Sequence, residues 1–113
     1  MRKIEKPWGY EIIWAETDRY VGKILHIEKG FSLSLQYHVV KDETVMVQSG
    51  ILTMQTGQDY SSRSFKMKPG ESFHISPGTI HRMSAVEGSV DVIEVSTPEL
   101  DDVVRLADNY GRV

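Results

Sequence analysis

The sequence predicts an all-β fold, and three observations support this prediction. Most of the 113 residues fall into short runs in which apolar and polar side chains alternate with a period of two. Turn signals such as Lys29-Gly30, Pro69-Gly70 and Pro77-Gly78 separate these runs. The chain has the length of one ordinary domain, so we expect residues 1–113 to form a single domain. Many short, evenly spaced strands are typical of a sandwich or barrel.

The alternating runs define the predicted strands in order along the chain. Each run is bounded by Gly, Pro, Ser or Asp, which are the residue types that favour turns. The predicted strands are Tyr10–Ala15, Val21–Glu28, Phe31–Val39, Thr44–Gln48, Ile51–Thr56, Ser64–Met67, Glu71–Ile75, His81–Val86 and Val90–Ser96.

The C-terminal segment is the part of the chain for which the sequence predicts a helix. Pro98 and the acids Glu99, Asp101 and Asp102 stand where the first turn of a helix prefers them. The apolar residues that follow would dock on the sheet. We therefore expect a short C-terminal helix, with Asp101 and Asp102 stabilising its N-terminus.

The composition excludes several functional classes. The net charge is −3 and no basic stripe is present, so we expect no nucleic-acid partner. The chain has no cysteine, which excludes disulfides, zinc ribbons and thiol catalysis. The N-terminus lacks the apolar run of a signal peptide, and no segment approaches the roughly 18–20 apolar residues that cross a bilayer. We expect a cytoplasmic protein that does not bind membranes.

Four side chains form a candidate metal site. Gln36 and His38 lie two residues apart on a predicted strand, so both project from the same face. Glu43 begins the next run, and an antiparallel return would bring it opposite His38. His81 opens a later strand and reaches the group only through tertiary contact. An amide oxygen, two imidazoles and a carboxylate suit a divalent transition metal such as Mn, Fe, Co, Ni or Zn, whereas Mg and Ca prefer oxygen ligands alone.

Two stretches, residues 30–50 with Gln36, His38 and Glu43 and residues 70–81 with His74 and His81, resemble the first and second sequence motifs of the cupin superfamily, whose members are small β-barrels of the jelly-roll type. A narrower resemblance covers nearly the whole chain and is to the C-terminal cupin domain of type II phosphomannose isomerases. In that family the domain usually follows a mannose-1-phosphate guanylyltransferase domain, whereas we expect it to stand alone here. The Gln at position 36, where cupins usually have His, is typical of the narrower family. The matching stretches are Lys6-Pro7-Trp8-Gly9, Leu33 to His38, Ile93-Glu94-Val95, Asp101 to Leu106 and Asp108 to Arg112.

The chain departs from the family pattern after His38. Where the family usually reads Arg-x-Glu-His-Trp, this chain has Lys41-Asp42-Glu43-Thr44-Val45. Lysine keeps the positive charge but loses the two-pronged hydrogen bonding of arginine. By its match to that arginine, the resemblance implies that Lys41 contacts a substrate phosphate. His74 precedes the turn of the second motif, and we expect it to line the cavity as a second substrate contact.

The resemblance implies a sugar-phosphate isomerase of the mannose 6-phosphate and fructose 6-phosphate class. A metal would act there as a Lewis acid that holds both oxygens of an enediolate. One carboxylate against a doubly charged ion leaves the site positive, which suits an anionic or hydroxyl-rich small molecule. The alternatives are a non-catalytic carbohydrate or nucleotide-sugar binding module, and another cupin enzyme such as an epimerase, lyase or dioxygenase. The sequence identifies no general base. We expect a homodimer, because small cupins often pair.

Overall fold

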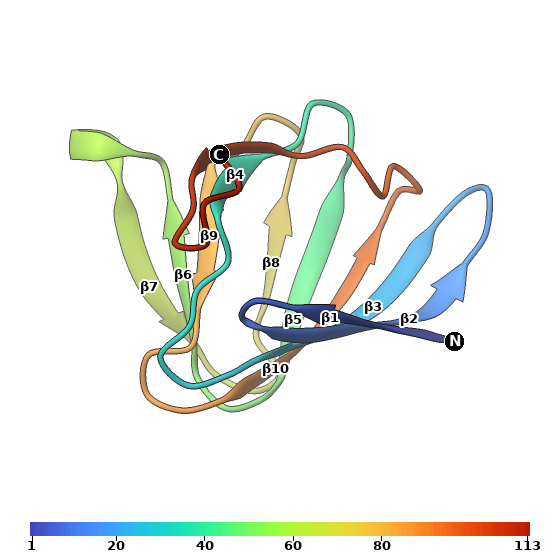
Figure 1. Ribbon diagram of the computed structural model, residues 1–113, viewed down its shortest axis with the longest axis horizontal. Coiled ribbons are helices and arrows are strands. Elements are labelled where there is room, and N and C mark those ends of the chain that lie inside the picture. The colour runs from blue at the N-terminus through green and yellow to red at the C-terminus, as the bar shows by residue number, and fades with distance from the viewer.

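The computed structural model describes residues 1–113, which form two antiparallel β-sheets that face each other (Figure 1). The larger sheet has the strand order β1-β2-β3-β10-β5-β8, and the smaller has β11-β4-β9-β6-β7. This arrangement confirms the all-β, jelly-roll prediction. The elements are β1 (Arg2–Lys6), β2 (Gly9–Glu16), β3 (Val21–Ile27), β4 (Leu35–Tyr37), β5 (Glu43–Ser49), β6 (Leu52–Thr56), the 3₁₀ helix η1 (Asp59–Ser61), β7 (Arg63–Met67), β8 (Ser72–Ile75), β9 (His81–Ser84), β10 (Val90–Ser96) and β11 (Val104–Ala107).

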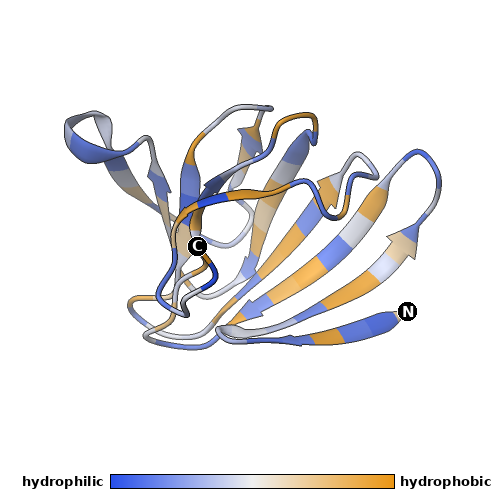
Figure 2. Cartoon of the chain, turned by 45° about the horizontal axis from the view of Figure 1, so that its top comes forward, coloured by the Kyte–Doolittle hydropathy of each residue, from blue (hydrophilic) through white to orange (hydrophobic).

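The core lies between the two sheets and follows the period-two pattern. Val45 and Val47 of β5 are buried, whereas Met46 between them faces outward. Figure 2 shows bands of hydrophobic and hydrophilic residues along the strands of the larger sheet. Each fully buried aliphatic side chain contributes about 1.5–3 kcal/mol to stability. The core cluster is Trp8, Leu25, Ile27, Leu33, Val45, Val47, Leu52, Met54, Met67, Ile75, Met83, Ala85, Val90 and Val92.

The inner face of the larger sheet changes from apolar to charged towards one end. On β10, Glu94 continues the inward face begun by Val90 and Val92, and it pairs in register with Lys23 of β3. On β5, Glu43 continues the inward face of the core valines. All three charged residues are buried. Because burying charge is unfavourable unless the charges are compensated, this end of the sandwich is where a functional site is expected.

The predicted C-terminal helix is wrong. Residues 104–107 form strand β11, which pairs antiparallel with β4, and residues 97–103 are irregular with a turn at residues 100–101. The acidic residues after Pro98 fit a helix start locally, but β4 offers an open edge whose backbone groups need partners. Tertiary pairing therefore decides the conformation over local preference.

The other differences concern strand ends and edges. Every predicted strand overlaps an observed one, but the run predicted over Phe31–Val39 is a regular strand only over Leu35–Tyr37, with an isolated bridge at Ser32. Strand β1 was not predicted, because its residues are mostly charged. Charged side chains are common on edge strands, where they discourage pairing with other chains. The structure contains no helix long and apolar enough to cross a membrane.

Candidate metal centre

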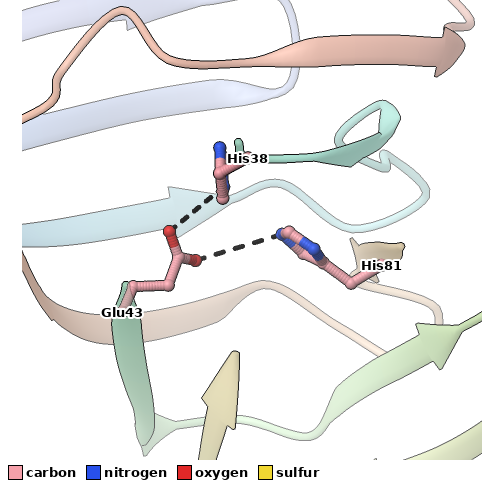
Figure 3. A group of neighbouring side chains, drawn as sticks. All are labelled: His38, Glu43 and His81. Carbon is pink, nitrogen blue, oxygen red and sulfur yellow. Dashed lines mark ion pairs between the residues drawn. The ribbon is translucent and has the colours of Figure 1, made fainter. Parts of the chain in front are cut away.

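Three of the predicted metal ligands converge at the charged end of the sandwich. Figure 3 shows His38, Glu43 and His81 pointing toward one another from different parts of the chain. Glu43 lies 3.2 Å from His38 Nε2 through one carboxylate oxygen and 4.0 Å from His81 Nε2 through the other. The three potential ligand atoms all lie within 4.8 Å of one another. Atoms bound to one ion at about 2.1 Å are about 3–4.2 Å apart, so small shifts bring this group to coordination geometry.

In each histidine, a hydrogen bond made by Nδ1 leaves Nε2 as the ring nitrogen that faces the centre. His38 Nδ1 hydrogen-bonds the backbone oxygen of Asp102 at 2.5 Å, and His81 Nδ1 hydrogen-bonds that of Thr79 at 2.9 Å. A carbonyl accepts only, so each Nδ1 carries the proton and each Nε2 presents a lone pair. Both Nε2 atoms are buried without a hydrogen-bond partner. Two lone pairs and a carboxylate that face one another fit a cation between them, and such backbone contacts are typical of metal-binding histidines.

Gln36 reaches the same region through strand register. On β4 it is the direct partner of His81 on β9 and of Arg105 on β11. Residues directly opposite on neighbouring strands project from the same face, so the three side chains form a row across the smaller sheet. Gln36 Oε1 accepts a hydrogen bond from Ser34 Oγ at 2.5 Å. This bond orients the amide and leaves a second lone pair on its oxygen.

The loop between His38 and Glu43 is held by the C-terminal segment. The Asp102 carboxylate accepts hydrogen bonds from the backbone N–H groups of Val39, Val40 and Lys41 at 2.7–3.0 Å. Gly78, in the turn before β9, donates its N–H to the His38 carbonyl at 2.7 Å. Its φ of 83° is a left-handed conformation that glycine adopts without strain. The two motifs and the C-terminal segment are thus fastened together around His38.

A buried lysine links Glu43 to a second carboxylate. Lys41 Nζ lies 3.1 Å from Glu43 and 3.2 Å from Glu94. Burial alone would lower the pKa of Lys41, but the attraction of Glu94 and Glu43 raises it. Burial would raise the pKa of Glu43, yet His38 and Lys41 lower it to about 2. The centre therefore has an ionised carboxylate.

Burial is the main cause of the pKa shifts of His81 and Glu94. Burial lowers the pKa of His81, and the opposing effect of the Thr79 carbonyl does not cancel it. Burial and the neighbouring Glu43 raise the pKa of Glu94. A neutral imidazole is the form that binds metal, so the lowered pKa keeps His81 ready to coordinate.

The centre opens into a cavity of about 230 Å³ between the sheets. Apolar side chains such as Leu33 and Met83 form part of its wall. Its charged lining consists of Arg2, Lys6, Glu11, Lys23, His38, Lys41, Glu43, Glu94, Asp101, Arg105 and Arg112, beside the amide of Gln36. Such a mixed wall can hold a small polar molecule next to the centre.

The two predicted substrate contacts lie in different surroundings. Lys41 is on the cavity wall, but its charge is already paired with Glu43 and Glu94. His74 is not among the cavity residues; its side chain is 60% exposed and its Nε2 lies 2.6 Å from Asp42. Its position alternates with buried Ile75, so it faces away from the core. The structure does not bring His74 to the centre.

Sequence reasoning missed two residues that shape the site. Glu94 stands on the same strand face as Val90 and Val92, so period-two alternation alone could have identified it as an inward-facing charge. Asp102 was interpreted as a helix-capping residue, and its contact with the loop after His38 depends on a chain reversal that no local pattern encodes.

Comparison with known proteins finds relatives among longer bacterial proteins. It is 36% identical over 117 residues to a mannose-1-phosphate guanylyltransferase of Escherichia coli K12, an alignment that covers 99% of this chain and 23% of the relative. It is 30% identical over 115 residues to the xanthan biosynthesis protein XanB of Xanthomonas campestris, covering 98% of this chain and 24% of that protein. The chain therefore spans about a quarter of the length of these curated relatives.

Solved structures confirm the fold. CapF superposes with a TM-score of 0.82 at 17% identity, covering 94% of this chain and 34% of CapF. KdgF from Halomonas sp. has a TM-score of 0.74 at 18% identity, covering 89% of this chain and 91% of KdgF. A cupin-superfamily sugar phosphate isomerase from Silicibacter pomeroyi has a TM-score of 0.66 at 21% identity, covering 78% of this chain and 58% of that one.

The match to a known family extends over nearly the whole chain. The profile described as mannose-6-phosphate isomerase C-terminal matches residues 1–108, which include every strand and all the side chains of the centre. With this match and the bacterial relatives, the chain belongs to the mannose-6-phosphate isomerase C-terminal family.

Proposed function

We propose that this protein binds one divalent transition metal ion through Gln36, His38, Glu43 and His81, and that it isomerises a sugar phosphate of the mannose 6-phosphate and fructose 6-phosphate class. The observation that carries the proposal is the group of two histidine lone pairs and a carboxylate, buried and facing one another beside the cavity. Membership of the mannose-6-phosphate isomerase C-terminal family supports the substrate class.

The proposed ligand set suits the isomerisation of an aldose to a ketose. A bound ion supplies Lewis acidity to the carbonyl and the neighbouring hydroxyl of the sugar. Lys41 holds the Glu43 carboxylate from the cavity side, and Asp102 fixes the loop that carries both residues. The walls of the cavity shield the sugar from bulk water. That Lys41 or His74 contacts the substrate stays a prediction.

The reaction also needs a group that moves a proton between neighbouring carbons. We propose Glu94 for this role, because it is a buried carboxyl on the cavity wall that is not among the proposed metal ligands. Glu94 is joined through Lys41 to Glu43 of the centre, whereas Glu11 is paired with Lys23 and has no such link. Asp101, the remaining carboxylate on the wall, is exposed.

Elemental analysis of the purified protein tests the metal site. We expect about one transition ion per chain in the wild type, and losses of at least tenfold in occupancy in Gln36→Ala and His81→Ala, since each removes a ligand. Gln55→Ala is the control. It changes a glutamine on β6, the strand that pairs with β9, and it should keep its metal. Equal metal content in wild type and ligand variants would contradict the site.

Turnover separates the enzyme from a binding module. Metal-loaded wild type should interconvert mannose 6-phosphate and fructose 6-phosphate, and Glu94→Gln should lose activity by at least a hundredfold while keeping its metal. Tight binding of either sugar phosphate without interconversion would instead support a non-catalytic module. A sample that neither binds nor converts them removes this substrate class and leaves the family assignment intact.

We also propose a cytoplasmic homodimer that acts on a small molecule and binds neither nucleic acid nor membranes. The exclusions rest on the net charge and the absence of a basic stripe. Sedimentation equilibrium at micromolar concentration tests the assembly, and a monomer at all concentrations would contradict the homodimer.

A further inference from the structure

The cations that line the cavity differ in whether a carboxylate already neutralises them. Lys41 is held between two carboxylates, and Lys23 is paired with Glu11 at 3.4 Å. Lys6 lies 4.0 Å from the same Glu11. Arg112 is paired with Asp108 at 2.8 Å, and Arg2 with Glu16 at 2.8 Å. Each of these side chains has a carboxylate within ion-pair distance, although Lys6 and Lys23 share that of Glu11.

Arg105 is the exception among the cavity cations. No carboxylate lies within ion-pair distance of its guanidinium, and its Nε is buried without a hydrogen-bond partner. A buried donor without an acceptor is unfavourable in a folded protein, and ligand-binding sites are one place where it persists. The side chain therefore has both an uncompensated charge and an unused hydrogen-bond donor.

The position of Arg105 relates it directly to the metal centre. It lies opposite Gln36 in the β11–β4 register, and Gln36 lies opposite His81 in the β4–β9 register. Neighbouring strands are about 4.8 Å apart, so the backbone of Arg105 is about one strand spacing from Gln36 and two from His81. A hexose phosphate carries its reacting carbons and its phosphate at opposite ends, so it needs an anion-binding group beside the metal centre and not at it.

We propose that Arg105 binds the phosphate group of a phosphorylated sugar whose other end lies at the metal centre. Guanidinium presents a planar pair of N–H donors that matches two phosphate oxygens, and it keeps its charge at every physiological pH. The identity of the sugar in this proposal rests on the proposed function. The anion-binding role of Arg105 itself rests only on the uncompensated cation and its place in the cavity.

Isothermal titration with four ligands tests the proposal: mannose 6-phosphate, fructose 6-phosphate, inorganic phosphate and mannose. In Arg105→Gln we expect the affinity for the three phosphate-containing ligands to fall about tenfold or more, since one charge-assisted contact is lost. Affinity for mannose should change less than twofold. Arg105→Lys keeps the charge without the fork and should bind with intermediate affinity. Arg63→Gln, an exposed arginine on β7, is the matched control and should bind as the wild type does.

Two outcomes would overturn the role of Arg105. One is phosphate affinity in Arg105→Gln within twofold of the wild type, and the other is an equal loss of mannose and mannose 6-phosphate binding. Repeating the inorganic phosphate titration on metal-free protein separates this result from the proposed function. Failure of the wild type to bind metal or to turn over sugar phosphate counts against that function, whereas failure of wild type to bind any phosphate counts against Arg105.

Discussion

Lys41 shows how a buried charge can organise a site through its neighbours. Its ammonium group lies between Glu43 and Glu94, and all three side chains are almost fully buried. Two buried carboxylates without this cation would repel each other in a medium that screens charge poorly. The lysine thus keeps the Glu43 carboxylate ionised and directed at the two histidines.

Replacing Lys41 with methionine tests this role at the scale of the residue. The change keeps the length of the side chain but leaves two buried carboxylates unpaired, so we expect Lys41→Met to destabilise the metal-free protein by about 3–5 kcal/mol. Urea unfolding in the presence of a chelator measures the loss.

The exposed pair Lys66–Glu87 provides the control for that substitution. Lys66→Met should change stability by less than about 1 kcal/mol, because solvent screens the pair. Adding Glu94→Gln to Lys41→Met should recover part of the loss by removing one of the uncompensated charges. Equal stability of Lys41→Met and Lys66→Met would show that the buried network has no such role.

At the scale of the element, the segment after β10 fastens the site together. Residues 97–103 run from the larger sheet to β11 in the smaller one, and Asp102 within them holds the loop after His38 through three backbone hydrogen bonds. The backbone oxygen of the same residue orients the His38 ring. Metal-site geometry is sensitive to such supporting contacts.

Asp102→Asn tests this supporting role. The substitution preserves the backbone oxygen and removes the negative charge that the three N–H groups share. We expect metal affinity to fall by about tenfold, with the number of ions per chain unchanged at saturation. Competition with a chromophoric chelator measures the affinity, and the absorption spectrum of the cobalt-loaded protein reports any change in coordination. Asp18→Asn, an exposed aspartate that makes no ion pair, is the control. Identical affinities for wild type and Asp102→Asn would contradict the supporting role.

The elements differ in how well the sequence predicted them, for physical reasons. Strands such as Val90–Ser96 have one face in the core, so their alternation is a direct consequence of burial. Strand β1 lies at a sheet edge and carries mostly charged side chains, which leaves little alternation to detect. For residues 97–107 the local pattern favours a helix, and only the open edge of β4 makes a strand the better solution.

In the site, too, features set by local sequence were predictable, and features set by tertiary contacts were not. The common face of Gln36 and His38 and the approach of Glu43 were predictable from period two and one chain reversal. The arrival of His81 was predicted only through the resemblance of the second motif, and the structure places it 4.0 Å from Glu43. Glu94, the second partner of Lys41, and Asp102, which holds the loop after His38, both lie more than fifty residues from Lys41 along the chain, beyond any local pattern. The assignment of the four residues as metal ligands stays a prediction.

At the scale of the whole molecule, the sandwich has an apolar end and an end with buried charged side chains. The apolar cluster between the sheets supplies most of the favourable burial. The other end buries a carboxylate and two unprotonated imidazole nitrogens that face one another, which is unfavourable without a cation. Because an ion that binds only the folded state stabilises it by mass action, metal binding should be visible in global unfolding.

We therefore expect the thermal stability of metal-free protein to rise when a transition ion is added. An ion present at a hundred times its dissociation constant stabilises the folded state by about 2.7 kcal/mol, which is about 10 °C in a domain of this size. Differential scanning calorimetry with Mn, Fe, Co, Ni and Zn measures the shift. His81→Ala should show a much smaller shift, and equal shifts in wild type and variant would locate the bound ion elsewhere.

The melting temperature, with and without metal, should depend on pH. Burial lowers the pKa of His81 in the folded state below its usual 6.5, so below that pH the unfolded chain binds more protons than the folded one. The contribution of His81 to stability is therefore complete above about pH 6.5 and is lost as the pH falls. Protons also compete with the metal for the same nitrogen, so the metal-induced shift in melting temperature should be constant from pH 8 to below pH 6.5 and decline only as the pH falls through the lowered pKa of folded His81. A shift that grows as the pH falls would mean that the ion does not bind through imidazole.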